Sequence, residues 1–103
     1  MYRVTTPTHT FTLPLDTGDC AEILLIYKQG GTELKKHYEN GVLPSGMTLD
    51  EEQVIQLLTQ EETKKFKPGF VNAQIRVLTN GGKSYASQVF SVNVNEVLNE
   101  EIL

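Results

Sequence analysis

One short segment of the sequence resembles the end of a phosphate-binding loop, the triplet Gly82-Lys83-Ser84. Such a loop cradles phosphates with backbone amides, and its pattern requires another glycine five residues before Gly82. That position is Val77, and a strand-like alternation follows Ser84 where the loop needs a helix. We therefore interpret residues 80–83, Asn-Gly-Gly-Lys, as the tight turn of a β-hairpin.

Few residues of the types that act as nucleophiles or metal ligands remain: one cysteine, Cys20, and two histidines, His9 and His37. A zinc site needs several Cys or His ligands, and neither histidine has a partner at ligand spacing. Cys20 has no basic neighbour in the sequence to activate its thiol, and a lone cysteine cannot form an intramolecular disulfide. We expect Cys20 to be a small packing residue and both histidines to be solvated strand residues.

Charged residues occur in short runs that do not match catalytic patterns. Asp50-Glu51-Glu52 and Glu100-Glu101 are adjacent in sequence, whereas glycosidases hold two carboxylates across a cleft. Residues 16–19 lack the alternating oxygen ligands of a calcium loop, and the lysines of residues 64–67 fit the C-terminal end of a helix. The sequence therefore predicts no catalytic, cofactor-binding or metal-binding residues, and we expect the protein not to be an enzyme.

The composition is that of one soluble globular domain. A chain of 103 residues holds one hydrophobic core, and 39% hydrophobic with 21% charged residues excludes disordered and membrane-spanning classes. Thirteen acidic against nine basic residues give a net charge of −4, which disfavours binding to nucleic acid or to an anionic membrane. The single cysteine fits a reducing compartment, and the first 19 residues lack the apolar region of a signal peptide.

Residues 9–15 alternate with period two, which predicts a strand. One face of this strand carries three apolar side chains: Phe11, Leu13 and Leu15. Because Pro14 has no N–H group, the strand should end there or lie at a sheet edge.

A hairpin is predicted after the turn at residues 16–19. Residues 22–28 are apolar on both faces and rich in β-branched and aromatic side chains, as in a central strand. The glycines of residues 29–32 turn the chain, and residues 33–38 form a more polar return strand. A loop with at most a short edge strand near residues 47–49 follows.

Residues 53–58 are compatible with two interpretations. A helix over residues 49–66 is one, but polar residues interrupt its apolar stripe, so we favour a strand followed by a short helix. Thr59 and Glu62 match a capping box, in which each residue satisfies a free backbone N–H of the other. We expect about two helical turns over residues 60–66.

The clearest alternation lies in residues 70–79 and 84–94, on either side of the turn at residues 80–83. The first of these strands directs four side chains inward: Val71, Ala73, Ile75 and Val77. The return strand directs four more: Ala86, Phe90, Val92 and Val94. Gln88 interrupts the second row, which indicates a β-bulge.

About seven short strands, regular turns and one helical turn near residues 60–66 predict an all-β, immunoglobulin-like β-sandwich. The sandwich forms a single domain over residues 1–94, and residues 95–103 form a C-terminal tail. The expected core consists of Phe11, Leu13, Ile23, Leu25, Val54 or Ile55, Leu57, Val71, Ile75, Val77, Phe90 and Val92.

The tail carries four aliphatic side chains beyond the last strand: Val97, Leu98, Ile102 and Leu103. Two outcomes are open for them. They fold back onto their own domain or fray, or the tail is a docking arm that pairs with a neighbouring subunit. We take these four residues as candidate partner-binding residues and expect a homo-oligomer or a protein-bound state that also uses an edge strand. The strand at residues 33–38 shows no obvious device that protects its edge.

Three segments resemble small proteins from prophages and phages of Gram-positive bacteria. They are YRVTTPTHTFTLPLD at residues 2–16, LTQEET at residues 58–63 and VNAQIRVLTNGGKSYASQVFSVNV at residues 71–94. The closing pattern of alternating strand, glycine turn, serine-rich return strand and acidic tail is similar to that of the N-terminal domains of phage baseplate upper proteins. The resemblance implies a virion- or tail-associated β-sandwich that acts by assembly, with no catalytic residues to transfer.

We therefore expect a non-enzymatic phage or prophage structural or assembly protein, associated with the virion, tail or baseplate. It would act through contacts with itself or with another virion component, without a cofactor, nucleic acid or membrane. The alternative is a bacterial β-sandwich binding module that recognises a protein or a carbohydrate through its loops. The expected location is the virion or the host bacterial cytoplasm, without secretion by a signal peptide.

Overall fold

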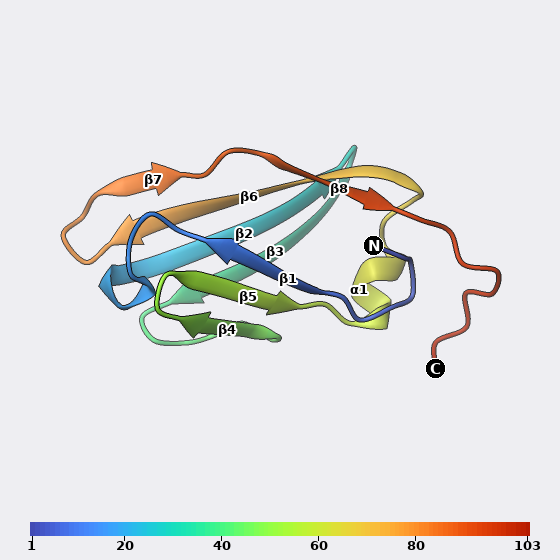
Figure 1. Ribbon diagram of the computed structural model, residues 1–103, viewed down its shortest axis with the longest axis horizontal. Coiled ribbons are helices and arrows are strands. Elements are labelled where there is room, and N and C mark those ends of the chain that lie inside the picture. Colours follow the sequence, from blue (N-terminus) through green and yellow to red (C-terminus); the bar gives the residue numbers. More distant parts are fainter.

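Two antiparallel sheets packed face to face form the protein, as a computed structural model of all residues 1–103 shows (Figure 1). The smaller sheet has the order β1-β5-β4, with β1 at Thr8–Thr12, β5 at Gln53–Leu57 and β4 at Met47–Asp50. The larger sheet has the order β3-β2-β6, with β3 at Thr32–Glu39, β2 at Cys20–Gln29 and β6 at Gly69–Thr79. Two short strands, β7 at Ser84–Ala86 and β8 at Phe90–Val94, pair one after the other with β6. The predicted all-β sandwich is confirmed.

The strand order matches an immunoglobulin-like sandwich that lacks its first strand. In the seven-stranded form, one sheet has the order A-B-E-D and the other contains C, F and G. Here β1, β5 and β4 take the places of B, E and D, while β2, β6 and the β7–β8 pair take those of C, F and G. No strand pairs with the outer edge of β1, where strand A would lie.

The central hairpin forms as its sequence predicts. β2 pairs with β3 on one side and with β6 on the other, which confirms it as a central strand. A two-residue turn between Gln29 and Thr32 joins β2 to β3, and Gly30 in that turn has a φ of 55°, a conformation that favours glycine. On β6 the four predicted inward residues are all buried, because a strand between two sheets alternates between core and solvent.

The segment after β4 forms a strand and then a short helix. β5 confirms the strand interpretation, and the alternative of an uninterrupted helix is wrong. The capping box is present, since the Thr59 hydroxyl accepts from Glu62 N (3.2 Å) and Thr59 N donates to Glu62 Oε1 (2.9 Å). The helix α1 (Gln60–Lys64) is shorter than predicted, because the chain turns at Lys65 to place Phe66 fully in the core.

The return strand after β6 is split where the sequence predicts an irregularity. Ser87 N donates to Ile75 O (2.8 Å), and the Ser87 hydroxyl, in place of a backbone carbonyl, accepts from Ile75 N (3.0 Å). The interruption shifts the alternation, so Ala86 lies opposite Arg76 on the outer face rather than inward as predicted. Phe90 then returns to the inward register opposite Ala73.

Most of the predicted core is confirmed, and three members are wrong. Leu57 is 47% exposed because the inward positions of this segment belong to Val54, Gln56 and Leu58, each fully buried. Phe90 and Val92 point inward, but Phe90 is 40% exposed and Val92 is only half-buried, because the smaller sheet does not extend over β8. The core also contains large side chains that were not predicted: Tyr27, Leu34, Leu58 and Phe66.

A buried polar cluster joins the two sheets on the side of β3, β4 and α1. Lys36 is 5% exposed, and its ammonium group contacts Glu62 Oε2 (2.5 Å) and the Ser45 hydroxyl (2.9 Å). Gln56 Nε2 donates to the backbone oxygen of Ser45 (2.9 Å). Burial alone would raise the pKa of Glu62, but the hydrogen bond and charge of Lys36, with the N–H of Thr59, lower it overall.

Truncating one inward side chain in the closed core and another at the partly exposed position of Phe90 tests which parts of the core are closed to water. Ile75→Ala should cost about 2–5 kcal/mol in the free energy of unfolding, because it leaves a cavity in a closed part of the core. Phe90→Ala should cost clearly less, since water already reaches that ring. Urea denaturation of both variants measures the difference. Equal losses in the free energy of unfolding would contradict the partial exposure of Phe90.

The buried ion pair can be tested with two neighbouring lysines. Lys36→Met should cost about 3–5 kcal/mol, because it leaves the carboxylate of Glu62 without its cation. Lys35→Met is the matched control, since Lys35 is exposed and contacts only the exposed Glu33; it should change stability by less than about 0.5 kcal/mol. Thermal and urea unfolding give both values, and equal effects of the two substitutions would show that the pair is not structurally important.

Candidate functional site

The C-terminal tail folds back beside α1 and the N-terminal segment instead of continuing as a strand (Figure 1). The guanidinium of Arg3 pairs with the carboxylate of Glu100. The side chain of Gln60 forms two hydrogen bonds with the backbone of Leu103, from Nε2 to the oxygen (3.0 Å) and from the Leu103 N–H to Oε1 (2.8 Å). Polar contacts therefore hold the tail of this chain against its own domain.

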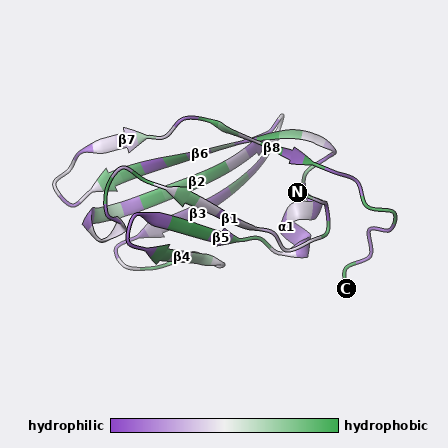
Figure 2. Cartoon of the chain, in the orientation of Figure 1, coloured by the Kyte–Doolittle hydropathy of each residue, from purple (hydrophilic) through white to green (hydrophobic).

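The apolar residues of the tail remain largely in water. Leu98 and Leu103 are fully exposed, Ile102 is 43% exposed and Val97 is half-buried. Figure 2 shows hydrophobic and hydrophilic residues mixed along this segment. The structure therefore does not bring the four predicted partner-binding residues into the core, and it leaves three of them available to another surface.

The outer edge of β1 has unpaired backbone groups. Leu13 N donates to Glu52 O (2.7 Å) and Pro7 O accepts from Leu58 N (3.0 Å), so the odd-numbered residues of this segment face β5. Antiparallel pairing alternates, so the even-numbered residues direct their N–H and C=O groups away from β5. These residues are Thr8, Thr10 and Thr12.

A groove of about 480 Å³ follows this edge, and we call it the β1–β8 groove. Its walls are the whole of β1 and two side chains of β8, Phe90 and Val92. Both side chains lie in inward register, opposite Ala73 and Val71, yet neither is fully buried. The ring centroids of Phe11 and Phe90 lie 5.5 Å apart across the groove. His9 is the one lining residue whose side chain can carry a charge.

His9 differs from its prediction. It is half-buried rather than solvated, and its Nδ1 lies 2.7 Å from the hydroxyl of the buried Tyr27. Burial lowers the pKa of His9, and the positive N-terminus lowers it further. The alternation showed that His9 shares a face with Phe11, which was the available signal that it points inward.

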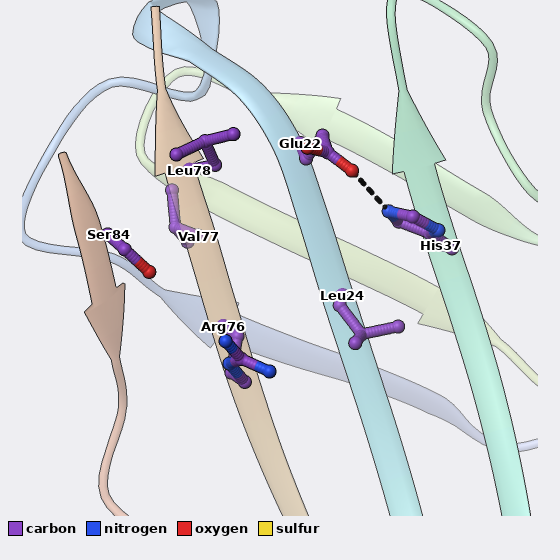
Figure 3. A pocket seen from close by; sticks show the side chains of 7 residues that line it. All are labelled: Glu22, Leu24, His37, Arg76, Val77, Leu78 and Ser84. Atoms are coloured by element: carbon purple, nitrogen blue, oxygen red, sulfur yellow. Dashed lines mark hydrogen bonds and ion pairs between the residues drawn. The ribbon is translucent and has the colours of Figure 1, made fainter. Parts of the chain in front are cut away.

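A second cavity, of about 280 Å³, lies on the outer face of the larger sheet (Figure 3). His37 Nε2 lies 2.9 Å from Glu22 Oε1, the contact drawn as a dashed line in Figure 3, and Arg76 borders the same hollow from β6. The donor and acceptor atoms of His37, Glu22 and Glu39 all lie within 4.8 Å of one another. The sequence analysis missed this cluster, because only the register of β2 on β3 brings its members together.

The geometry of this cluster is that of surface ion pairs. Glu22 approaches Nε2 of the His37 ring, whereas Glu39 lies 4.0 Å from Nδ1, so the two carboxylates address different nitrogens. All three side chains are at least one-third exposed, and exposed groups of this kind are common without a metal ion. The cluster therefore supports no metal assignment.

The other residues that were weighed for chemistry have structural roles. Cys20 is buried, and burial together with the carboxylates of Asp19 and Asp16 raises the pKa of its thiol, which confirms the predicted packing role. The turn at residues 80–83 closes a hairpin, in which Thr79 N donates to Lys83 O (2.8 Å). This confirms a turn where the sequence resembled a phosphate-binding loop.

In comparisons with known proteins, no protein-family model, curated protein or solved structure matches this chain. The single α-helix has five residues, and the structure contains no helix long and apolar enough to cross a membrane.

The buried position of His9 predicts how stability depends on pH. Its pKa is lower in the folded protein than the ordinary value of 6.5, so the unfolded chain takes up the proton more readily. The contribution of neutral His9 to the free energy of unfolding is complete above pH 6.5, the pKa of the unfolded chain. It should decline as the pH falls below 6.5 towards the lower pKa of the folded protein. Urea unfolding at about pH 7.5 and about pH 5 should show this loss in the wild type and a smaller loss in His9→Gln. Equal losses in the two proteins would contradict the assignment to His9.

Proposed function

We propose that this protein is a non-enzymatic structural or assembly protein that acts through protein–protein contacts, including contacts between its own copies. One observation supports this most directly. A tail with fully exposed leucines and a strand with an unpaired backbone edge occur in the same small domain. Exposed apolar side chains and open strand edges are the features that proteins use for association.

The contrast between the strand edges of the molecule strengthens the argument. The edge strand β3 has charged or ionisable outward side chains, which protect it although the sequence analysis recognised no such device: Glu33, Lys35, His37 and Glu39. β4 is only four residues long and leads into an acidic turn, and the β7–β8 edge is interrupted at residues 87–89. The outward-facing residues of β1 are threonines, which carry no charge. It is therefore the edge best suited to pairing.

The sequence resemblance supports a phage or prophage setting for this assembly, in the virion, tail or baseplate. Two of the three resembling segments, residues 2–16 and 71–94, contain β1 and β8, the two walls of the β1–β8 groove. The net charge of −4 favours a protein partner over nucleic acid.

Light scattering over a concentration series tests the proposal. The full-length chain should exceed the protomer mass of 11.5 kDa as its concentration rises, and deletion of residues 96–103 should return it to that mass. Leu98→Ser with Leu103→Ser should act like the deletion, because it removes the exposed leucines, whereas Asn99→Ser serves as a control on an already polar position. A full-length chain that stays at the protomer mass at every concentration would overturn the proposal.

A further inference from the structure

The edge of β1 lacks the neighbour that a complete immunoglobulin-like sheet places there. The N-terminal residues do not fill the position. They run parallel to the end of β8 instead, where Tyr2 bridges to Asn95 and Arg3 N donates to Asn95 O (3.0 Å). They then cross to the start of β1, so the whole length of β1 beyond Pro7 remains open on one side.

We propose that the C-terminal tail of a second copy occupies this position. Residues 96–103 of one copy lie as an added strand along β1 of the next and cover Phe90 and Val92 in the β1–β8 groove. This inference rests on the proposed assembly function, and it names the partner and the receiving surface.

The backbone of β1 is suited to such a strand. The open edge presents three N–H and three C=O groups in alternation, from Thr8, Thr10 and Thr12. An extended peptide added to a sheet edge gains main-chain hydrogen bonds there, while its alternate side chains occupy pockets beside the edge. The β1–β8 groove supplies the apolar surface for those side chains.

The length and the exposed residues of the tail fit the groove. Eight extended residues span roughly 26 Å, and the five residues of β1 require roughly 17 Å, so a few residues remain to connect the two copies. In its own chain the tail leaves Leu98 and Leu103 in water, whereas in the groove an aliphatic side chain meets the exposed ring of Phe90. The transfer therefore covers apolar surface on both partners.

A single strand fits this site better than a second smaller sheet. The larger sheet extends past the open edge of β1 at β7 and β8. The inward-facing side chains Phe90 and Tyr85 are therefore left about half exposed. A second copy that paired its own β1 here would bring its own larger sheet into the space that β8 occupies. The tail has no sheet beneath it, so it avoids this clash.

The charges permit the contact. The groove lining contains no carboxylate that would repel the acidic tail. In its own chain the tail is held by Arg3, whose pair with Glu100 is partly buried, and by Lys64, whose Nζ donates to Glu100 O (3.2 Å) at the surface. Exchange between copies would therefore break these polar contacts and form a strand pairing in their place.

The proposed contact joins two different surfaces of the protein. Each copy offers one groove and one tail, so the interface joins unlike surfaces and is heterologous. Such interfaces produce a ring where the rotation closes and an open filament where it does not.

Proline substitution at the open edge tests the site. The Thr10 N–H faces the groove and not β5, so Thr10→Pro removes a donor for the added strand without removing a bond of the sandwich. It should raise the dissociation constant of self-association at least about tenfold. Lys35→Pro is the matched control, because Asn40 N bonds to Ala21 O and places the odd-numbered N–H groups of β3 at its open edge. It should leave association unchanged, and thermal unfolding checks that both variants fold.

Mixing two defective proteins tests the partner. A protein without residues 96–103 keeps the groove, and Thr10→Pro keeps the tail, so each alone should remain at the protomer mass. An equimolar mixture should form a species of twice that mass. A mixture that stays at the protomer mass would overturn the inference. Phe90→Ala, which retains every backbone donor, provides a second groove variant and should replace Thr10→Pro if the proline impairs folding.

The outcomes separate this inference from the proposed function. If full-length protein associates and neither Thr10→Pro nor Phe90→Ala weakens the association, the β1–β8 groove is not the receiving site, although the protein still assembles. If deletion of the tail leaves association unchanged, the tail is not the added strand. If the full-length chain does not associate, the proposed function itself fails.

Discussion

The ion pair between Lys36 and Glu62 is the contact on which the closed side of the sandwich depends. Glu62 belongs to the capping box of α1, and the same carboxylate receives the ammonium group of a lysine on β3. Lys36 also contacts the Ser45 hydroxyl, and Gln56 on β5 binds the Ser45 backbone oxygen. One buried charge pair therefore joins the helix to both sheets. Removing Glu62 would leave the buried ammonium group of Lys36 without its charged partner, which would destabilise this side of the molecule.

The opposite side of the sandwich has no such closure. There β1 and β8 face each other across a groove with an apolar floor, and no polar contact joins the sheets beyond His9 and Tyr27. An edge strand must either be protected or be paired, since its free N–H and C=O groups otherwise form hydrogen bonds with any neighbouring chain. The protected edge of β3 and the unprotected edge of β1 show both solutions in one domain. The strand addition that we propose would thus take place on the side of the domain that lacks a buried ion pair.

Local patterns predicted the parts of this structure in which a single period or motif governs the residues. The alternation of β6 and the capping box of α1 are of this kind, and both are confirmed. The errors arise where tertiary contacts override the pattern. Gln56 takes an inward position because Ser45 satisfies its amide N–H, which moves Leu57 to the surface. Phe90 points inward as predicted, but no local signal reveals that the smaller sheet stops short of it. The cluster around His37 depends on cross-strand register, which no spacing along the chain encodes.

In the proposed assembly, the contacts of the tail within its own chain would decide how readily it reaches a neighbour. Gln60, Arg3 and Lys64 hold the tail against its own surface, so only the fraction of copies with a released tail is competent to donate it. The apparent affinity between copies falls in proportion to that fraction. The contacts of Gln60 and Lys64 are exposed, whereas the pair of Arg3 with Glu100 is partly buried, so Arg3 would provide the strongest restraint on the tail. The proposed exchange would therefore depend on protein concentration, because a released tail would meet a free groove more often where copies are gathered.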